Sequence, residues 1–237
     1  MRRSTVLVAV SLAGLALATA AHAADPPFNW PAAPEVQRAR LPITELSSGW
    51  YLRGDVGYRF NRAGVPDSLV TITSQSYGNT YVYGGGFGYK YQWFRTDATL
   101  DYGARAMYHG NTATVPAFYN GKVSAMTALA NVYFDLGTWS LVTPYVGAGI
   151  GTSYVNVTDY INVTVPVLIP QAGRWNLSWA AMGGASFRFA PNWALDVGYR
   201  YLKLGDATSG DGTLPNNIRF RNLSAHDVRI GFRYLLD

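Results

Sequence analysis

The segment Trp50–Phe60 most constrains what this chain can fold into, because reading it two residues at a time separates two unlike faces. Alternation with a period of two predicts a β-strand whose sides meet different surroundings. One face is apolar and aromatic, and the other carries charges of both signs. The apolar face holds Trp50, Leu52, Gly54, Val56, Tyr58 and Phe60, and the polar face holds Tyr51, Arg53, Asp55, Gly57 and Arg59. This combination is typical of a transmembrane barrel strand, with lipid outside, a polar interior and aromatic rings at the membrane boundary.

The same alternation recurs along the rest of the chain, separated by connections that are in turn long and short. It predicts further strands at Thr80–Tyr91, Phe94–Tyr102, Lys122–Leu136, Leu141–Tyr154, Arg174–Phe189 and Trp193–Leu202, and a last one ending over Val228–Leu236. The long connections are Asn61–Asn79, Ala104–Gly121, Val155–Gly173 and Lys203–Arg219. Strict alternation indicates an all-β fold, an eight-stranded antiparallel up-and-down transmembrane β-barrel over residues 49–237.

The N-terminal residues predict export. Arg2 and Arg3 precede an apolar run, Val6–Thr19, and Ala21-His22-Ala23 has the small-x-small pattern of a cleavage site. We therefore expect a signal peptide over residues 1–23, cleaved after Ala23. Residues 24–48 hold prolines at positions 26, 27, 31, 34 and 42. Because proline cannot donate to a β-ladder, this stretch is interpreted as an extended periplasmic leader.

Composition excludes several classes of protein. Removal of two arginines with the signal lowers the net charge from +5 to about +3, which gives no argument for nucleic-acid binding. Without cysteine, an exported chain of this length depends on its backbone ladder and packing. The longest charge-free window after the signal, Leu136–Thr158, is interrupted by Pro144 and several glycines, so it makes a poor membrane helix.

Charged residues fall on the inward parity of the predicted strands. The cations are Arg53, Arg59, Lys90, Arg95, Arg188, Arg200, Arg229 and Arg233, and the anions are Asp55, Asp97, Asp101, Asp135, Asp196 and Asp227. Eight strands enclose a space just wide enough for side chains to fill. A connected salt-bridge network that plugs the barrel is therefore predicted, because an arginine fork can serve two carboxylates. A narrow gated or leaky pore is the alternative.

Tryptophans support the same topology from an independent pattern. Trp50, Trp93, Trp139 and Trp193 all lie at the short-turn ends of predicted strands. Such a ring of indoles is typical of a membrane interface, so these residues predict a periplasmic aromatic girdle.

Catalytic and metal chemistry have little support in the sequence. Ser224 and His226 share one strand face and suggest a nucleophile and base of a lipid hydrolase. All glutamates lie in the leader, however, and a non-catalytic histidine at the membrane interface explains the pair. Two distant histidines and no cysteine argue against a metal site. We expect no cofactor.

Three motifs resemble the small outer-membrane β-barrel proteins of alphaproteobacteria, a family related in architecture to the OmpA membrane domain that includes surface antigens. They are Gly49–Tyr58, Pro144–Gly151 and Trp193–Tyr201. The resemblance implies insertion by the barrel-assembly machinery, whose C-terminal signal is matched in spacing by Arg229, Gly231, Tyr234 and Leu236. Leu235, Leu236 and Asp237 replace the family's usual terminal phenylalanine.

The resulting functional expectation is a protein of the cell outer membrane, acting in envelope integrity and surface interaction through four long extracellular loops. Its expected partners are outer-membrane lipid and lipopolysaccharide, the assembly machinery and an extracellular ligand. The alternatives are a narrow porin-like channel, a lipid-modifying enzyme, and haem capture by loop residues, as in some family members. The loop residues suited to haem are Tyr77, Tyr108, Tyr119, Tyr160 and His109.

Overall fold

A computed structural model of the chain describes residues 48–62, 64–67, 72–112, 118–162, 167–169, 171–209 and 218–236. The predicted signal peptide and almost all of the leader lie outside these residues. Backbone contacts divide the chain into Met1–Leu41 and Pro42–Asp237, and all the described residues belong to the second unit.

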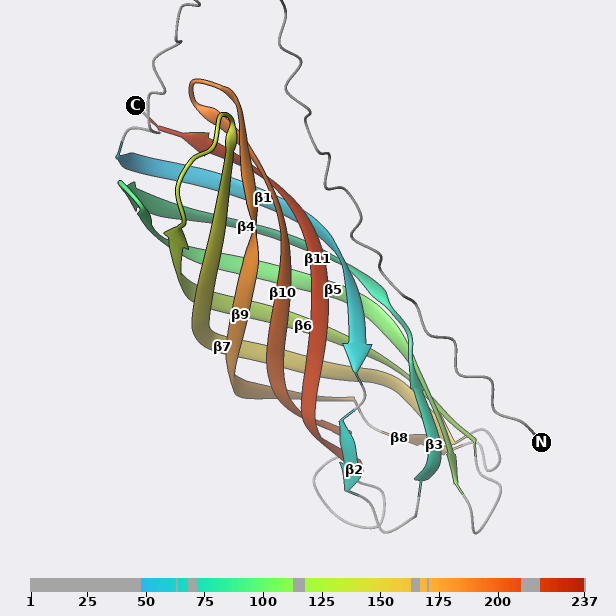
Figure 1. The fold of residues 1–237 in the computed structure, drawn as a ribbon. Coiled ribbons are helices and arrows are strands. Elements are labelled where there is room, and N and C mark those ends of the chain that lie inside the picture. The colour runs from blue at the N-terminus through green and yellow to red at the C-terminus, as the bar shows by residue number, and fades with distance from the viewer. Residues whose placement is uncertain are drawn as a thin grey trace, which may run out of the picture. The chain divides into compact units, whose positions relative to one another are not determined.

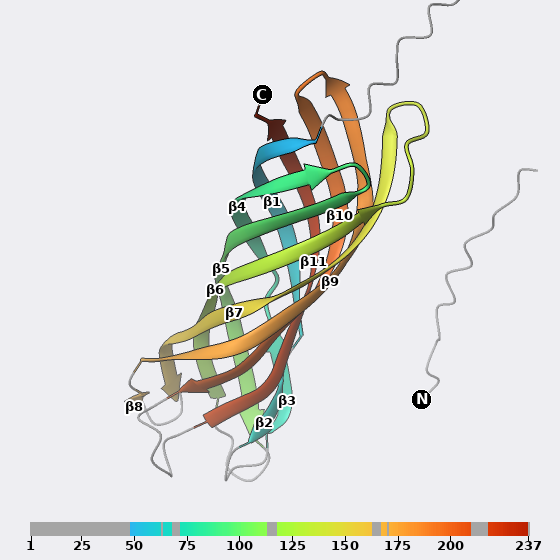
Figure 2. The same ribbon diagram turned by 90° about the vertical axis from the view of Figure 1, so that its left-hand side faces the viewer.

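Eight long strands within the described residues form a closed antiparallel barrel, as predicted (Figures 1 and 2). They are β1 (Gly49–Arg62), β4 (Thr80–Tyr91), β5 (Phe94–Thr112), β6 (Phe118–Asp135), β7 (Val142–Asn162), β9 (Ala172–Ala190), β10 (Trp193–Ser209) and β11 (Ile218–Leu235). Each pairs with the next, and β1 pairs with β11 to close the ring. No helix in the described part of the chain is long and apolar enough to span a membrane.

Three short strands accompany the long ones at the end opposite the short turns (Figure 1). These are β2 (Val65–Asp67) beside β11, β3 (Ile72–Tyr77) beside β5 and β8 (Val167–Ile169) beside β7. The short turns lie at Gln92–Trp93, between β6 and β7, and at Pro191–Asn192. The connections fall at the two ends of the barrel in turn, as predicted, but the predicted alternation of their lengths is not kept throughout. Because the strands continue into stretches predicted as long connections, the β5–β6 connection over residues 113–117 has five residues, whereas the β6–β7 connection over residues 136–141 has six.

The two faces of the long strands have the assigned environments. Burial along β1 alternates from Trp50 to Arg62, with Tyr51, Asp55 and Arg59 buried and Leu52 and Val56 exposed. In β4, glycine replaces large residues on the inner face because little room is left there. A Cβ on Gly88 would collide with the Thr96 carbonyl oxygen and the Tyr51 ring, whereas one on outward-facing Gly54 would meet nothing within 4 Å.

Several strands run well beyond the predicted bounds, which corrects the predicted loops. β5 continues to Thr112 and β7 to Asn162, through stretches predicted as connections. In these extensions the polarity of the faces reverses: Tyr108, Val155 and Val157 are buried inside, while Arg105 is exposed outside. Apolar residues on the outer face were the sign of a strand in the sequence. The predicted strands therefore end where the membrane-facing residues end, although the β-ladder continues.

Bulges mark the transition between the two regions. The β5–β6 register shifts between Gly103 and Ala106, so the inward parity of β5 changes from odd to even residues. A similar shift on β10 occurs between Lys203 and Ala207, where Gly205 has a φ of 89°. An extra residue leaves the ladder at a bulge and turns the following side chains to the other face.

Candidate functional site

The barrel interior is the candidate functional site. We call the end with the short turns the lower end and the opposite end the upper end, although Figure 1 shows the short turns at the top. The lower part of the interior holds an unbroken chain of ion pairs. Asp97, Arg53, Asp55, Arg229, Asp101, Arg200, Asp227 and Arg59 follow one another in this chain, with alternating sign. Equal numbers of arginines and aspartates make it electrically balanced. We call this group the long ion chain.

Arginine forks provide the continuity of the long ion chain. Arg200 donates to Asp101 at 2.6 Å with one nitrogen and to Asp227 at 2.7 Å with another. Arg53 does the same, reaching Asp55 at 2.7 Å and Asp97 at 2.8 Å. Charge-assisted bonds of this length are the strong class of hydrogen bond.

A second, shorter ion chain lies nearer the short turns. Arg233 pairs with Asp196 at 3.2 Å, Arg95 lies between Asp196 at 3.9 Å and Asp135 at 2.9 Å, and Lys90 donates to Asp135 at 2.6 Å. All five side chains are nearly inaccessible to solvent. The structure thus places every predicted interior charge except Arg188 in an ion pair of these two chains.

Arg188 differs from the other predicted members in its position. It is half-buried on the inner side of β9, and its backbone N–H donates to the Leu141 carbonyl at 3.0 Å.

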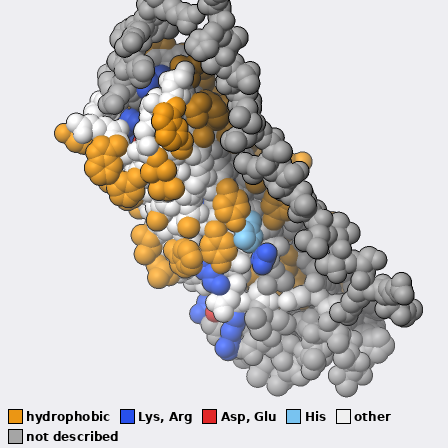
Figure 3. All heavy atoms as spheres, viewed as in Figure 1, with side chains coloured by type: hydrophobic (Ala, Val, Ile, Leu, Met, Phe, Trp, Pro, Cys, Tyr) orange, Lys and Arg blue, Asp and Glu red, His pale blue; other side chains and the backbone are white. Residues whose placement is uncertain are grey.

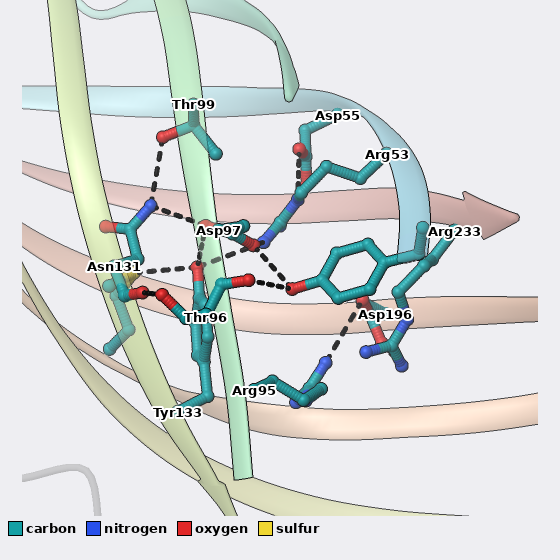
Figure 4. Close-up of polar contacts among 12 residues, drawn as sticks. Arg53, Asp55, Arg95, Thr96, Asp97, Thr99, Asn131, Tyr133, Asp196 and Arg233 are labelled. Atoms are coloured by element: carbon teal, nitrogen blue, oxygen red, sulfur yellow. Dashed lines mark hydrogen bonds and ion pairs between the residues drawn. The ribbon is translucent and has the colours of Figure 1, made fainter. Parts of the chain in front are cut away.

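Neutral polar residues join the ion chains, and the sequence analysis did not single them out (Figure 4). The Tyr51 hydroxyl donates to Asp97 at 3.0 Å, and Asn131 donates to the other oxygen of the same carboxylate at 2.8 Å. Arg53 donates to the Tyr133 hydroxyl at 3.0 Å, and the Arg95 guanidinium lies over the Tyr133 ring. These residues occupy inward-facing positions of the alternating pattern, and this was the signal available in the sequence. Only the charged residues at such positions were predicted to form the network.

Above the long ion chain the interior becomes apolar, which the sequence analysis did not predict. This apolar tier consists of Tyr108, Val123, Ala125, Leu129, Val155, Val157, Ala180, Leu202, Leu204, Ala207, Phe220, Leu223 and Ala225. Tyr77 packs against it, with its ring centroid 5.1 Å from that of Tyr108. Burial raises the pKa of Tyr108 to about 12, because the phenolate would lose its hydration.

The cavities described between these side chains are small. One cavity of about 20 Å³ lies beside Arg53 and Tyr145, and another of about 20 Å³ lies where the apolar tier meets Arg59, lined by Val155 and Leu204 on one side. Each volume is enough for about one water molecule.

The outer surface carries two aromatic girdles. Trp50, Trp93, Trp139 and Trp193 are all exposed at the short-turn end, where the sequence analysis placed them. A second girdle includes Tyr58, Phe60, Tyr81 and Trp175, farther along the strands. Ten residues separate Trp50 from Phe60, which is about 33 Å along a strand and roughly 23 Å across the membrane at a tilt of about 45°. The apolar band of an outer-membrane barrel has a height of about 25 Å.

Residues considered for ligand binding lie in other places than expected. Tyr108 is 1% exposed, so the prediction that it is a loop residue is wrong. Tyr77 is half-buried beside it, because β3 lies against the extended β5. The side chains of Tyr119 and Tyr160 fall outside the described set. His109 is exposed and contacts the Asn120 side-chain oxygen at 2.7 Å.

The Ser224–His226 pair, considered from the sequence as a hydrolase nucleophile and base, points outward. Ser224 and His226 share the outer face of β11, and the His226 Nδ1 atom is hydrogen-bonded to the Tyr199 hydroxyl. That bond leaves Nδ1 unavailable to an acidic residue that would orient the ring. Among the described residues, no cluster of histidines and carboxylates suits a metal ion.

The residues of the predicted assembly signal lie along the last strand and just beyond it. Arg229 and Gly231 face the interior, where Gly231 leaves room for the Asp55 carboxylate. Tyr234 packs on Trp193 at the outer surface, with ring centroids 4.8 Å apart, and the Leu236 N–H donates to the Trp50 carbonyl at 2.8 Å. Their role in assembly stays a prediction.

Comparison with known proteins agrees with this architecture. The chain matches the family described as outer membrane protein beta-barrel domain over residues 8–234. It is 30% identical to an uncharacterised protein of Brucella suis, over 82% of this chain and 87% of the relative, and 24% identical to a putative adhesin of Rickettsia akari, over 80% and 89%. The crystal structure of Neisserial surface protein A is similar in fold, with a TM-score of 0.54, 18% identity, and coverage of 80% of this chain and 98% of that one. The chain therefore belongs to the outer-membrane protein β-barrel family, and it is a protein of the cell outer membrane.

Proposed function

We propose that this protein is a non-conducting surface protein that acts through its extracellular end, in adhesion or recognition and in envelope integrity. In outer-membrane barrels the short turns are periplasmic and the long connections extracellular. The observation that carries the proposal is the filling of the interior by two different tiers. Paired charges occupy the lower part, and the apolar tier occupies the part toward the long connections.

A continuous water path would have to cross both tiers. In the lower one, Arg200, Asp101 and Asp227 are at most 2% exposed and are bonded to one another. In the upper one, Tyr108 and Phe220 are in contact, with ring centroids 4.9 Å apart, and both are 1% exposed. These contacts favour a plug over a narrow channel.

The extensions give the extracellular end a rigid base. β5 and β6 stay paired up to Asn111 and Phe118, and β3 adds to the same sheet. Loops carried on rigid strands are common sites of recognition. The likeness to a protein called a putative adhesin supports the same class of function.

Conductance separates a plug from a channel. The purified full chain, reconstituted in planar bilayers, should give no steady conductance under conditions in which a water-filled porin does. Stable, salt-dependent steps that are abolished by heating the protein to its unfolded form would refute the plug.

Surface binding tests the recognition role. Cells displaying the full chain should adhere to extracellular-matrix or host-cell surfaces more strongly than cells displaying a variant with residues 113–117, 163–166 and 210–217 replaced by Gly/Ser of equal length. Equal adhesion, with both proteins folded and equally abundant at the surface, would contradict a role for these segments.

Haem capture and lipid hydrolysis have less support from the geometry than surface recognition has. Burial of Tyr108 removes one side chain from the residues suited to haem, and the Tyr199 bond occupies one nitrogen of His226. We therefore propose that the protein is not an enzyme. Expression should leave the fatty-acid content of lipid A and phospholipids unchanged, and released fatty acid that disappears with Ser224→Ala would overturn this.

A further inference from the structure

Three outward-facing polar residues share one row of strand pairing on β10, β11 and β1. Lys203 lies opposite Ser224, and Ser224 lies opposite Arg62. Adjacent strands are about 4.8 Å apart, so the backbones of the two basic residues flank the serine at a separation of about 10 Å. Both basic side chains are long enough to converge above the hydroxyl. The Lys203 ammonium already lies on this surface, donating to the Asn222 carbonyl at 3.3 Å.

The next row toward the periplasm is aromatic. Tyr201 lies opposite His226, and His226 lies opposite Phe60. The His226 and Tyr201 rings are 5.3 Å apart, and the Tyr199 hydroxyl bond fixes the imidazole. Val228 and Ile230 continue the outer face of β11 below this row, and both are about half exposed. A basic and hydroxyl-bearing row therefore lies directly above aromatic and aliphatic surface.

Outward-facing cations on the described strands lie only toward the extracellular end. They are Arg62, Arg105, Lys122, Lys203 and Arg221. Figure 3 shows basic side chains along the loop-side edge of the hydrophobic band, next to a histidine. Two described carboxylates lie three residues from a member of the row. Asp227 faces the interior and is bonded to Arg59 and Arg200, and Asp206 accepts the Asn222 backbone N–H at 3.0 Å. Lys122 is already paired with Asp159 at 2.9 Å.

We propose that Arg62, Ser224 and Lys203 bind a phosphate group of an outer-leaflet glycolipid of the lipid A type. An arginine fork and an ammonium are the groups that recognise phosphate, and a hydroxyl adds a neutral donor. The site lies at the extracellular edge of the lipid-facing band, where the phosphates of the outer leaflet are located. Acyl chains would lie over the aromatic row and then over Val228 and Ile230.

The same placement gives Ser224 and His226 a binding role in place of the hydrolase role considered from the sequence. Ser224 donates to the lipid phosphate, and His226 supports the apolar platform below it. The proposal depends on the membrane orientation of the barrel and not on the adhesion function, so either can fail alone.

The test is a titration of the full chain in phosphatidylcholine nanodiscs with diphosphorylated lipid A. Lipid A should raise the temperature at which the folded, fast-migrating gel band is lost, and this shift yields an apparent Kd. The double variant Arg62→Gln, Lys203→Gln should weaken that Kd about tenfold or more, as expected when hydrogen bonds to charged groups are removed. The matched control, Arg105→Gln with Lys122→Gln, removes the same charge from the same edge and should change the Kd less than about twofold.

Ser224→Ala provides a second variant without a change of charge, and it should weaken the Kd several-fold. Equal weakening in the two double variants would overturn the proposal, because it would indicate a general attraction to the basic edge. So would an undiminished shift with dephosphorylated lipid A, or an equal shift with phosphatidylglycerol, which is an anionic lipid of a different class.

Discussion

Asp227→Asn should be among the most destabilising single substitutions in the barrel, although it changes almost no volume. The Asp227 side chain is 0% exposed and accepts two bonds from Arg59, at 2.7 and 3.0 Å, and two from Arg200, at 3.0 and 2.7 Å. An asparagine removes the charge and one acceptor oxygen. Arg200 keeps Asp101 as a partner, but Arg59, which is 2% exposed, loses its carboxylate partner in the long ion chain.

The expected magnitude follows from this burial. Removing one partner of a buried ion pair costs about 3 to 5 kcal/mol, because an uncompensated charge remains, whereas exposed pairs are worth little. We therefore expect the free energy of unfolding to fall by about 3 to 5 kcal/mol. Adding Arg59→Met, which removes the stranded cation, should recover part of the loss, since residues in one network couple by about 0.5 to 3 kcal/mol.

These differences in the free energy of unfolding are measured by reversible unfolding in urea of the protein folded in lipid vesicles. Tryptophan fluorescence and the gel mobility of the folded form report the folded fraction. Asp159→Asn is the control, because it removes a carboxylate from an exposed pair with Lys122 and should leave the unfolding midpoint unchanged. A loss below about 1 kcal/mol for Asp227→Asn, or no recovery in the double variant, would refute a dry, charge-paired interior.

Other predictions test the outer face, the packing and the extension. Val146→Arg places a charge toward lipid and should cost about 2 to 4 kcal/mol in the same unfolding assay if it lies near the midplane; tolerance equal to that of an exposed loop position would contradict the assigned face. Gly88→Ala should cost about 1 to 3 kcal/mol through overpacking, whereas Gly54→Ala should be nearly neutral, and equal effects would argue against a crowded interior. Because burial raises the pKa of Tyr108 from 10.0 to about 12, the folded state binds the proton more tightly than the unfolded state, so stability should fall as the pH rises from 10.0 through about 12. An alkaline absorbance titration of the folded protein against Tyr108→Phe should show this late ionisation, and a tyrosine that titrates near 10 would place Tyr108 in water.

The membrane-facing part of the fold could be predicted from the sequence, because the alternation of apolar and polar residues within each strand indicates which face meets lipid. Along β1 and β4 every second side chain meets lipid, and this requirement is local to the strand. The same holds for the interfacial tryptophans, which are found beside each short turn. None of these features requires knowledge of which strands are neighbours.

The strand extensions at the end opposite the short turns were not accessible from the sequence in the same way. Above the membrane, water replaces lipid outside the barrel, so apolar residues such as Val155 move to the inside and the pattern reverses. Bulges near Gly103 and Gly205 then shift which parity faces inward. Because these segments lack the outward apolar residues of a membrane strand, their sequence predicts polar loops.

The sequence by itself determined that this chain forms a barrel in a bilayer with charges inside, because period-two alternation and interfacial aromatics are properties of single strands. Which aspartate neutralises which arginine was decided only by the tertiary structure. Arg59 and Asp227 are 168 residues apart in the chain and become cross-strand neighbours only when β11 pairs with β1. Ring closure brings such distant charges together, and their pairing, with the apolar tier above them, determines how the interior is filled.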